Sequence, residues 1–396
     1  MQAVILAGGL GTRLAPFTES KPKPMYPVQG KPFIHYLIEQ VKGFGITNVV
    51  ILLGYLPHII ENELGNGKEY GVNIRYDVTP VEYDTGARLR HAYGLLEDSF
   101  LLMYCDNYCP IDFARLLESF NRNHALIQLT AYANRDGYTK NNLHISDDGK
   151  VLLYDKKRLS ENLAGVDIGY ALMRKEVFCF LPDGNNNFEA AVYPHVAECG
   201  KMYATITEHR YYSIGSWARI KLTEQFFRHR KAVFLDRDGT INVRPPKACY
   251  VEKTEDFVWL PGAIEAVRLL KENGYLLILI SNQPGIARGN LTEDMLAAIH
   301  TKMQADLSAV GAGMDAIYYC PHNWDEGCFC RKPQPGMLYQ AQRDLSLDIP
   351  DDCILIGDDE RDLEAAKRAA CPSILVSADY SFLTAAKDII AKKFIL

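Results

Sequence analysis

In the first half of the chain, short runs of β-branched and aliphatic residues alternate with segments whose apolar residues recur at helical spacing. The apolar runs lie at 3–7, 49–53 and 100–105, and the helical segments lie at 33–44 and 87–96. This alternation predicts βαβ units on a mostly parallel sheet, because each helix returns the chain to the edge where the next strand starts.

A second series of the same kind starts after a helix-like stretch at 217–229. Its strands are predicted at 232–235, 276–280, 316–319, 354–356 and 374–376, and its helices near 262–273, 293–310 and 360–370. The junction at 228–231 has no Gly/Ser/Pro-rich spacer, so no long flexible tether is expected. We therefore predict two α/β domains, at residues 1–229 and 230–396.

Composition agrees with two domains, because 396 residues with 48% hydrophobic side chains exceed one ordinary domain. The formal net charge of −6 gives no bulk attraction for a polyanion, so no nucleic-acid partner is expected. The first residues, MQAVILAGG, lack a basic segment, and the apolar runs are too short to span a bilayer. We therefore expect a cytoplasmic protein without membrane contact, whose ten cysteines are reduced thiols or metal ligands.

Polar side chains that suit phosphate and metal chemistry follow the strands predicted in the second half. They are Asp236 and Asp238 after the first strand, the hydroxyl of Ser281 and the amide of Asn282 after the second, Lys332, and Asp358 after 354–356. An aspartate can attack phosphorus, and a second carboxylate two residues on can protonate the leaving oxygen and later activate water. Because open α/β sheets place their sites at the carboxyl ends of strands, these groups predict one pocket for phosphate and Mg²⁺.

This motif set resembles the haloacid-dehalogenase superfamily of phosphatases over the segment 231–377. The resemblance implies an α/β fold with a parallel sheet. It also implies Asp236 as nucleophile, Asp238 as general acid and base, Ser281 and Lys332 as phosphate ligands, and Mg²⁺ held by Asp358, Asp236 and the backbone carbonyl of Asp238.

The segment 320–332 adds a second constellation, of three thiols, one imidazole and two cations. The thiols and the imidazole belong to Cys320, His322, Cys328 and Cys330. Four such ligands form a closed tetrahedral zinc site with no position left for water, so the expected role is structural. The zinc would fix a loop that ends at Arg331 and Lys332 and direct both cations toward the substrate phosphate.

Together with the runs 282–289 (NQPGIARG) and 331–337 (RKPQPGM), this loop resembles the D-glycero-D-manno-heptose 1,7-bisphosphate phosphatases and the related histidinol-phosphate phosphatases. The resemblance to the heptose enzymes implies removal of the 7-phosphate and retention of the 1-phosphate. Asp359 departs from it, because a basic residue is expected at that position. Histidinol phosphate stays open as an alternative substrate.

A glycine-rich turn follows the first predicted strand, and a Lys-Pro-Lys-Pro run follows the turn. The turn contains Gly8, Gly9, Gly11 and Thr12. Its backbone amides can approach phosphate oxygens closely, and Arg13 and Lys23 can neutralise the charge of phosphoryl transfer. No GK[ST] follows and the third glycine of a dinucleotide fingerprint is missing, so the turn predicts neither a Walker loop nor a dinucleotide site.

The turn and the basic run resemble the sugar-1-phosphate nucleotidyltransferase family, over roughly residues 2–220. The resemblance implies a Rossmann-like fold with a mixed sheet. By its motifs, Gly86 lies in the turn facing nucleobase and sugar, Asp106 binds Mg²⁺, Lys156 reaches the sugar phosphate, and Asp167 lies on the sugar-contacting strand. The implied reaction is attack of a sugar 1-phosphate on the α-phosphorus of a nucleoside triphosphate, with release of pyrophosphate. Ser213 departs from the family, in which an aspartate is the usual second metal ligand.

A phosphatase that leaves an anomeric phosphate makes the kind of molecule that a nucleotidyltransferase uses. We therefore predict a bifunctional enzyme that converts heptose 1,7-bisphosphate to heptose 1-phosphate and then to an NDP-heptose, with GTP as the first choice of triphosphate. Mg²⁺ is expected in both halves and structural Zn²⁺ in the second, and the resemblance favours a homo-oligomer. The alternative is that the first half only binds a nucleotide sugar, because the neutral Ser213 hydroxyl is a poorer magnesium ligand, unless Asp167 or a water fills the position.

Overall fold

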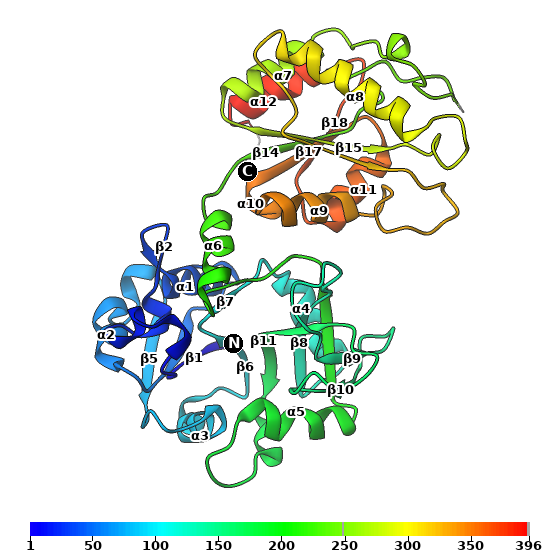
Figure 1. The fold of residues 1–396 in the computed structure, drawn as a ribbon. Helices are drawn as coiled ribbons and strands as arrows, with labels where there is room; N and C mark the ends of the chain where they lie inside the picture. The colour runs from blue at the N-terminus through cyan, green and yellow to red at the C-terminus, as the bar shows by residue number, and fades with distance from the viewer. Residues whose placement is uncertain (248, 394–396) are drawn as a thin grey trace. The chain divides into compact units, whose positions relative to one another are not determined.

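The computed structural model describes residues 1–247 and 249–393, and the chain divides into two compact units, residues 1–227 and 228–396 (Figure 1). The boundary expected between 229 and 230 falls two residues from this division. That the two parts fold independently stays a prediction. Within the described residues, no helix is long and apolar enough to cross a membrane.

A seven-stranded sheet forms the centre of the first unit, in the order β12–β8–β11–β6–β1–β4–β5. The strands are β1 (Gln2–Ala7), β4 (Asn48–Leu53), β5 (Asn73–Val78), β6 (Ser99–Tyr104), β8 (Ile127–Tyr132), β11 (Val166–Arg174) and β12 (Met202–Thr207). β11 runs antiparallel to both of its neighbours, whereas the other pairs are parallel. The predicted mixed sheet is therefore confirmed.

Helices cover both faces of this sheet, so its central strand β1 is buried on both sides. In β1, Ala3 and Ile5 belong to one apolar cluster, and Val4 and Leu6 belong to the other. The first cluster includes side chains of α1 (Phe33–Gly43), α2 (Pro57–Leu64), α4 (Phe113–Arg122) and α6 (Trp217–Phe226). The second includes side chains of α3 (Thr85–His91) and α5 (Phe188–Glu198).

Three two-stranded sheets lie beside the main sheet. They are β2 (Pro27–Val28) with β3 (Lys31–Pro32), β7 (Asn107–Tyr108) with β13 (Tyr212–Ser213), and β9 (Leu143–Ile145) with β10 (Val151–Tyr154). The β7–β13 pair aligns Ser213 with Asn107, so it brings Ser213 next to the end of β6.

The second unit contains a parallel five-stranded sheet in the order β16–β15–β14–β17–β18. Its strands are β14 (Ala232–Leu235), β15 (Leu276–Asn282), β16 (Ala316–Cys320), β17 (Cys353–Gly357) and β18 (Ser373–Leu375). α7 (Ala263–Glu272), α8 (Glu293–Ser308) and α12 (Phe382–Ile390) pack on one face, and α9 (Gly336–Leu345), α10 (Ile349–Asp352) and α11 (Glu360–Arg368) on the other. The predicted parallel α/β fold is confirmed, and β14 lies at its centre.

A buried arginine in α3 ties together three loops of the first unit. The Arg88 side chain is 3% exposed. Nη1 donates to the carbonyl of Leu53 at 2.7 Å, and Nη2 donates to the carbonyls of Gly8 at 3.2 Å and Val81 at 3.0 Å. A Cβ on Gly8 would lie 2.4 Å from Arg88 Cζ, so only glycine allows this close approach.

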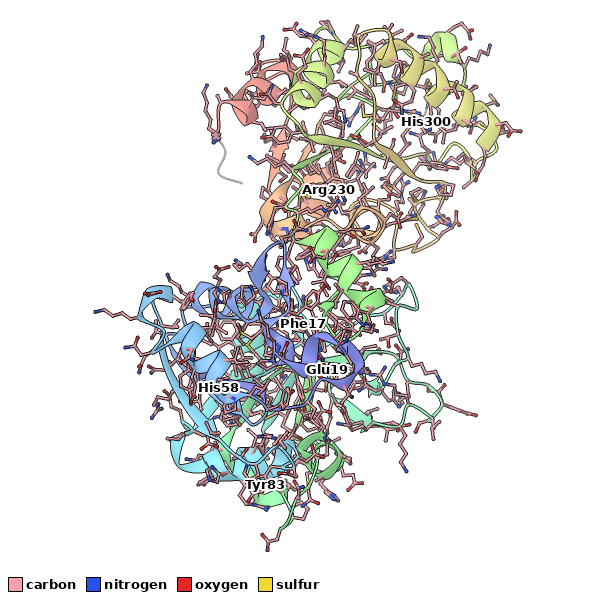
Figure 2. All side chains as sticks on the ribbon, turned by 60° about the vertical axis from the view of Figure 1, so that its left-hand side comes forward. Phe17, Glu19, His58, Tyr83, Arg230 and His300 are labelled. Atoms are coloured by element: carbon pink, nitrogen blue, oxygen red, sulfur yellow. The ribbon has the colours of Figure 1, made fainter. Side chains whose placement is uncertain are left out.

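A buried histidine in α8 lies on one face of the second unit (Figure 2). His300 is 9% exposed, its ring lies 6.2 Å from that of Tyr319, and Nε2 has no hydrogen-bond partner among the described residues. Burial lowers the pKa of His300 to about 4, and the nearby Arg237 cation acts in the same direction.

The first prediction concerns Arg88. Arg88→Met removes the donor on which several buried carbonyl groups depend, so we expect a loss of about 3–5 kcal/mol in the free energy of unfolding. Urea denaturation of the full chain measures it. Arg122→Met is the matched control, because its partner Glu118 is 72% exposed; we expect a loss below about 0.5 kcal/mol. Equal losses in the two variants would contradict the role of Arg88.

The second prediction concerns pH. The folded pKa of His300, about 4, lies below the unfolded value of 6.5, so the unfolded chain takes up the proton first as the pH falls. Relative to His300→Gln, the wild-type chain should lose up to about 3 kcal/mol of stability between pH 6.5 and pH 4. Urea denaturation across this range measures the difference, with His195→Gln as an exposed control. A difference that does not depend on pH would disprove the buried neutral state.

Candidate active sites

A cavity of about 740 Å³ opens where β14, β15 and β17 end. Its lining includes six residues that were predicted from the sequence: Asp236, Asp238, Ser281, Asn282, Arg331 and Lys332. It also includes Arg288 from the run 282–289, and residues that the motifs did not indicate, among them Arg244, Trp324, Arg361 and Asp362. The carboxyl ends of adjacent parallel strands meet here, which explains why segments distant in sequence line one cavity.

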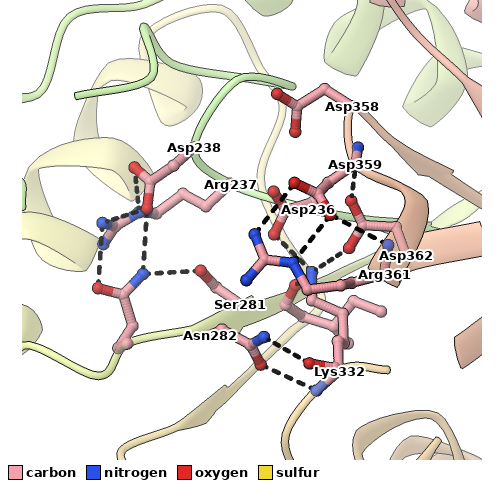
Figure 3. Close-up of polar contacts among 12 residues, drawn as sticks. Asp236, Arg237, Asp238, Ser281, Asn282, Lys332, Asp358, Asp359, Arg361 and Asp362 are labelled. Carbon is pink, nitrogen blue, oxygen red and sulfur yellow. Dashed lines mark hydrogen bonds and ion pairs between the residues drawn. The ribbon is translucent and has the colours of Figure 1, made fainter. Parts of the chain in front are cut away.

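Lys332 lines this cavity, and its side chain is 3% exposed (Figure 3). Nζ lies 2.6 Å from a carboxylate oxygen of Asp236 and 2.6 Å from one of Asp362, and it donates to the carbonyl of Ile280 at 2.9 Å. Asn282 forms two hydrogen bonds with the Lys332 backbone, at 2.9 and 3.0 Å. The amide expected to bind phosphate therefore holds Lys332 in place.

The two aspartates after β14 have opposite pKa shifts. Burial raises the pKa of Asp236 to about 7, although Lys332 favours the ionised form. Burial also opposes ionisation of Asp238, but the guanidinium of Arg237, together with Asn242 and Gln283, outweighs it and lowers the pKa of Asp238. The fully buried Arg237 donates to both carboxylate oxygens of Asp238, at 3.1 and 2.9 Å.

Gln283 and Gly239 complete this part of the site. Gln283 donates to Asp238 at 3.2 Å and to the Ser281 hydroxyl at 2.7 Å, so one amide fixes both predicted groups. Gly239 has φ +101°, and a Cβ there would lie 1.9 Å from a carboxylate oxygen of Asp358. A glycine at 239 is therefore needed for the close approach of Asp358 to the chain after Asp238.

Carboxylate oxygens of Asp236, Asp358 and Asp362 lie within 4.8 Å of one another, close enough for a divalent cation to bind among them. Asp358 Oδ1 is buried without a hydrogen-bond partner among the described residues, which suits a hard cation such as Mg²⁺. The carboxylate of Asp238 lies outside this group, which agrees with a backbone ligand at that position. Asp362 follows Asp358 by four residues and lies in the first turn of α11, a spacing that could have identified it.

Four zinc-type ligands lie together next to the same cavity. Cys320 Sγ lies 3.6 Å from Cys328 Sγ, and His322 Nδ1 lies 3.2 Å from Cys330 Sγ. These separations fit a tetrahedron with Zn–S bonds of about 2.3 Å and a shorter Zn–N bond. Arg331 follows directly and donates to the His322 carbonyl at 3.3 Å, so the cluster and the cavity wall are one loop.

In the first unit, a cavity of about 350 Å³ is lined by the glycine-rich turn. The predicted residues in its lining are Gly8, Gly9, Gly11, Thr12, Arg13, Lys23 and Asp106. Lys23 forms an ion pair with Asp106, and Arg13 is exposed. Tyr83, labelled in Figure 2, and Arg88 also line this cavity and were not predicted.

A second cavity, of about 190 Å³, shares Tyr104 and Asp106 with the first. It contains the predicted Lys156 and Asp167, and it adds Glu189, to which Lys156 is paired. Burial raises the pKa of Asp167 to about 7, and the charge of Glu189 acts in the same direction. Glu189 lies in α5, and no sequence motif indicated it.

The polar groups of Gly86 and Ser213 make hydrogen bonds within the protein. Gly86 does not line either cavity; its N–H donates to the Asn186 carbonyl at 2.8 Å, and a Cβ would lie 2.6 Å from that oxygen.

Ser213 accepts a hydrogen bond from the Gly215 N–H at 3.0 Å. A Cβ on Gly215 would lie 3.1 Å from Ser213 Oγ and 3.8 Å from Asp106 Oδ2, so both groups lie next to Gly215. One carboxylate with substrate phosphates and waters fits the way Mg²⁺ is held in such sites.

The comparisons with known proteins divide along the chain in the same way. The family profile "Nucleotidyl transferase" matches residues 2–141, and the profile "HAD-hydrolase-like" matches residues 329–391. HddC from Yersinia pseudotuberculosis, solved in complex with GMP-PN, is 24% identical with a TM-score of 0.50; the match covers 57% of this chain and 99% of that one, and it shows the fold alone.

Curated relatives establish the family of the phosphatase part. The D-glycero-beta-D-manno-heptose-1,7-bisphosphate 7-phosphatase of Pasteurella multocida is 43% identical over 146 residues, which is 35% of this chain and 77% of the relative. The enzyme of the same name from Photorhabdus laumondii is 46% identical over 145 residues, 35% of this chain and 75% of the relative. The chain thus belongs to the D-glycero-beta-D-manno-heptose-1,7-bisphosphate 7-phosphatase family and joins this phosphatase to a nucleotidyl transferase unit.

Proposed function

We propose that the chain removes the 7-phosphate of D-glycero-D-manno-heptose 1,7-bisphosphate and then transfers GMP from GTP to the resulting heptose 1-phosphate. The products are phosphate, pyrophosphate and GDP-heptose. One observation carries the proposal: the same chain holds a phosphatase cavity around Asp236 and a glycine-lined cavity around Asp106. The first reaction leaves the anomeric phosphate that the second consumes. Because the transfer consumes GTP and both reactions act on phosphosugars, we place them in the cytoplasm.

In the phosphatase reaction, a carboxylate oxygen of Asp236 attacks phosphorus and the heptose oxygen leaves with a proton from Asp238. Water then attacks the aspartyl phosphate, gives its proton to Asp238, and phosphate is released. Because Arg237, Asn242 and Gln283 lower the pKa of Asp238, the bound phosphate dianion must raise it before Asp238 can act as an acid. Mg²⁺ held by Asp236, Asp358 and the Asp238 carbonyl would supply charge neutralisation.

In the nucleotidyl transfer, an oxygen of heptose 1-phosphate attacks the α-phosphorus of GTP and pyrophosphate leaves in line. The amides of the glycine-rich turn cradle the triphosphate, and Arg13 and Lys23 offset its charge. Lys156 is placed to meet the sugar phosphate, with Asp167 and Glu189 beside it for sugar hydroxyls. Asp106 would hold Mg²⁺, which supplies charge neutralisation here also. The guanine nucleotide bound to HddC supports GTP as donor.

A second candidate function rests on Ser213. Its hydroxyl and the Asp106 carboxylate both lie next to Gly215, and a neutral hydroxyl is a poorer Mg²⁺ ligand than a carboxylate. In this alternative, the first unit binds a nucleotide sugar without turnover and regulates an active phosphatase.

The third prediction is a coupled assay on the purified chain with heptose 1,7-bisphosphate, Mg²⁺ and each nucleoside triphosphate in turn. We expect equal amounts of phosphate and pyrophosphate with GTP, and phosphate alone without a triphosphate. Separate colorimetric detection of the two products measures both reactions. Phosphate alone under all conditions would favour the binding function, and hydrolysis of histidinol phosphate in place of the heptose would reject the heptose assignment.

Two variants assign the two products to their sites. Asp236→Asn should abolish phosphate release from the bisphosphate but retain pyrophosphate release from heptose 1-phosphate and GTP. Asp106→Ala should show the opposite pattern. Retained pyrophosphate release in Asp167→Ala would exclude Asp167 as the missing metal ligand.

The fourth prediction concerns zinc, which we propose is bound by Cys320, His322, Cys328 and Cys330. Cys328→Ser should lower zinc content and reduce phosphate release at least about tenfold, because Arg331 and Lys332 lose their anchored loop. Elemental analysis and the phosphate assay measure the two effects, while pyrophosphate release from heptose 1-phosphate should not change. Cys179→Ser, an exposed thiol of the first unit, is the control. Full phosphatase activity in zinc-free protein would contradict the anchoring role.

A further inference from the structure

Asp359 stands where the resemblance to the heptose phosphatases predicts a basic residue, and its carboxylate is occupied by a neighbouring cation. Oδ1 lies 2.8 Å from Arg361 Nε, and Oδ2 lies 3.0 Å from Arg361 Nη2 (Figure 3). This two-point contact is the geometry in which a carboxylate holds a guanidinium plane in one orientation.

The backbone reinforces the same pairing. Asp359 is the N-cap of α11, and its side chain accepts the backbone N–H of Arg361 at 3.0 Å. Asp359 therefore binds both the backbone N–H and the guanidinium group of Arg361. The side chain of Arg361 is half-exposed and lines the cavity that contains Asp236.

Arg361 retains a donor that a phosphate can use, whereas the Lys332 ammonium group has none left. The Lys332 ammonium group is shared between Asp236 and Asp362, and Arg244 is shared between Asp358 and Asp359. Arg361 uses Nε and Nη2 for Asp359, which leaves Nη1 without a partner among the described residues. A guanidinium group that is bound through Nε and Nη2 can still donate from Nη1 to an anion.

We propose that Arg361, oriented by Asp359, binds phosphate oxygens of the substrate next to Asp236 and replaces the basic side chain expected at position 359. Asp359 is thus a positioning residue, and the positive charge in the cavity comes from Arg361, two residues farther along the chain. The inference rests on the proposed phosphatase function and names a binding residue within that site.

A double-mutant cycle tests the proposal in the full chain. Asp359→Ser retains an N-cap side chain but loses the two-point contact, and Arg361→Ala removes the cation. Arg361→Ala should lower kcat/KM for phosphate release at least tenfold, and Asp359→Ser should lower it about threefold to tenfold. In the Arg361→Ala background, Asp359→Ser should have little further effect, because the guanidinium group that Asp359 orients is then absent.

Inorganic phosphate provides a readout besides turnover. Its inhibition constant should rise at least tenfold in Arg361→Ala and less in Arg361→Lys, which keeps the charge but loses the fork. Arg368→Ala, which breaks the exposed pair with Glu364 on the same helix, should leave both measurements unchanged. Thermal unfolding checks that each variant is folded, and Arg361→Lys carries the test if Arg361→Ala is not.

Two results would overturn the inference. In the first, Asp359→Ser lowers kcat/KM for phosphate release by the same factor with and without Arg361. In the second, the phosphate inhibition constant does not change in the Arg361 variants. Failure of the proposed function looks different. The wild-type chain would then not hydrolyse heptose 1,7-bisphosphate, while the variants would still shift phosphate affinity measured by calorimetry and hydrolysis of p-nitrophenyl phosphate.

Discussion

The contact of the Lys332 ammonium group with two buried carboxylates is the interaction on which the phosphatase cavity depends. All three ammonium protons are used, by Asp236, Asp362 and the Ile280 carbonyl. Without that charge the two carboxylates would repel each other at close range in a site with little water. The hydrogen bonds from Asn282 and the thiol–imidazole loop serve the same end, because both fix the segment that delivers Lys332.

Sequence reasoning predicted the parts of the fold and site that depend on local pattern. Each strand of the second sheet was predicted within a few residues, and the buried strands β14 and β17 show why, because buried parallel strands form continuous apolar runs. The residues directly after those strands followed at once, since parallel strand ends share an edge. Asp236, Ser281 and Lys332 could therefore be placed in one cavity from the sequence alone.

The remaining residues depend on contacts between distant segments, which no single motif contains. Glu189 enters the second cavity from α5, and its pairing with Lys156 joins residues 33 positions apart. For Asn282 and Gly86, the sequence predicted a ligand contact that the structure does not show. Their polar groups were expected to meet a ligand, but the structure satisfies them with backbone atoms of Lys332 and Asn186. A sequence shows that an amide is present, whereas only the packed chain decides whether protein or ligand binds it.

Arg88 gives the first unit a fixed positive charge that has no carboxylate in direct contact among the described residues and lies beneath the glycine-rich turn. A guanidinium group stays protonated across the physiological range, so the potential it contributes to the cavity does not vary with proton concentration. Its pull on an approaching anion is instead weakened by mobile ions, over a screening length of about 8 Å at physiological salt. The contribution of Arg88 to the capture of a polyanionic nucleotide therefore responds to ionic strength and not to its own protonation.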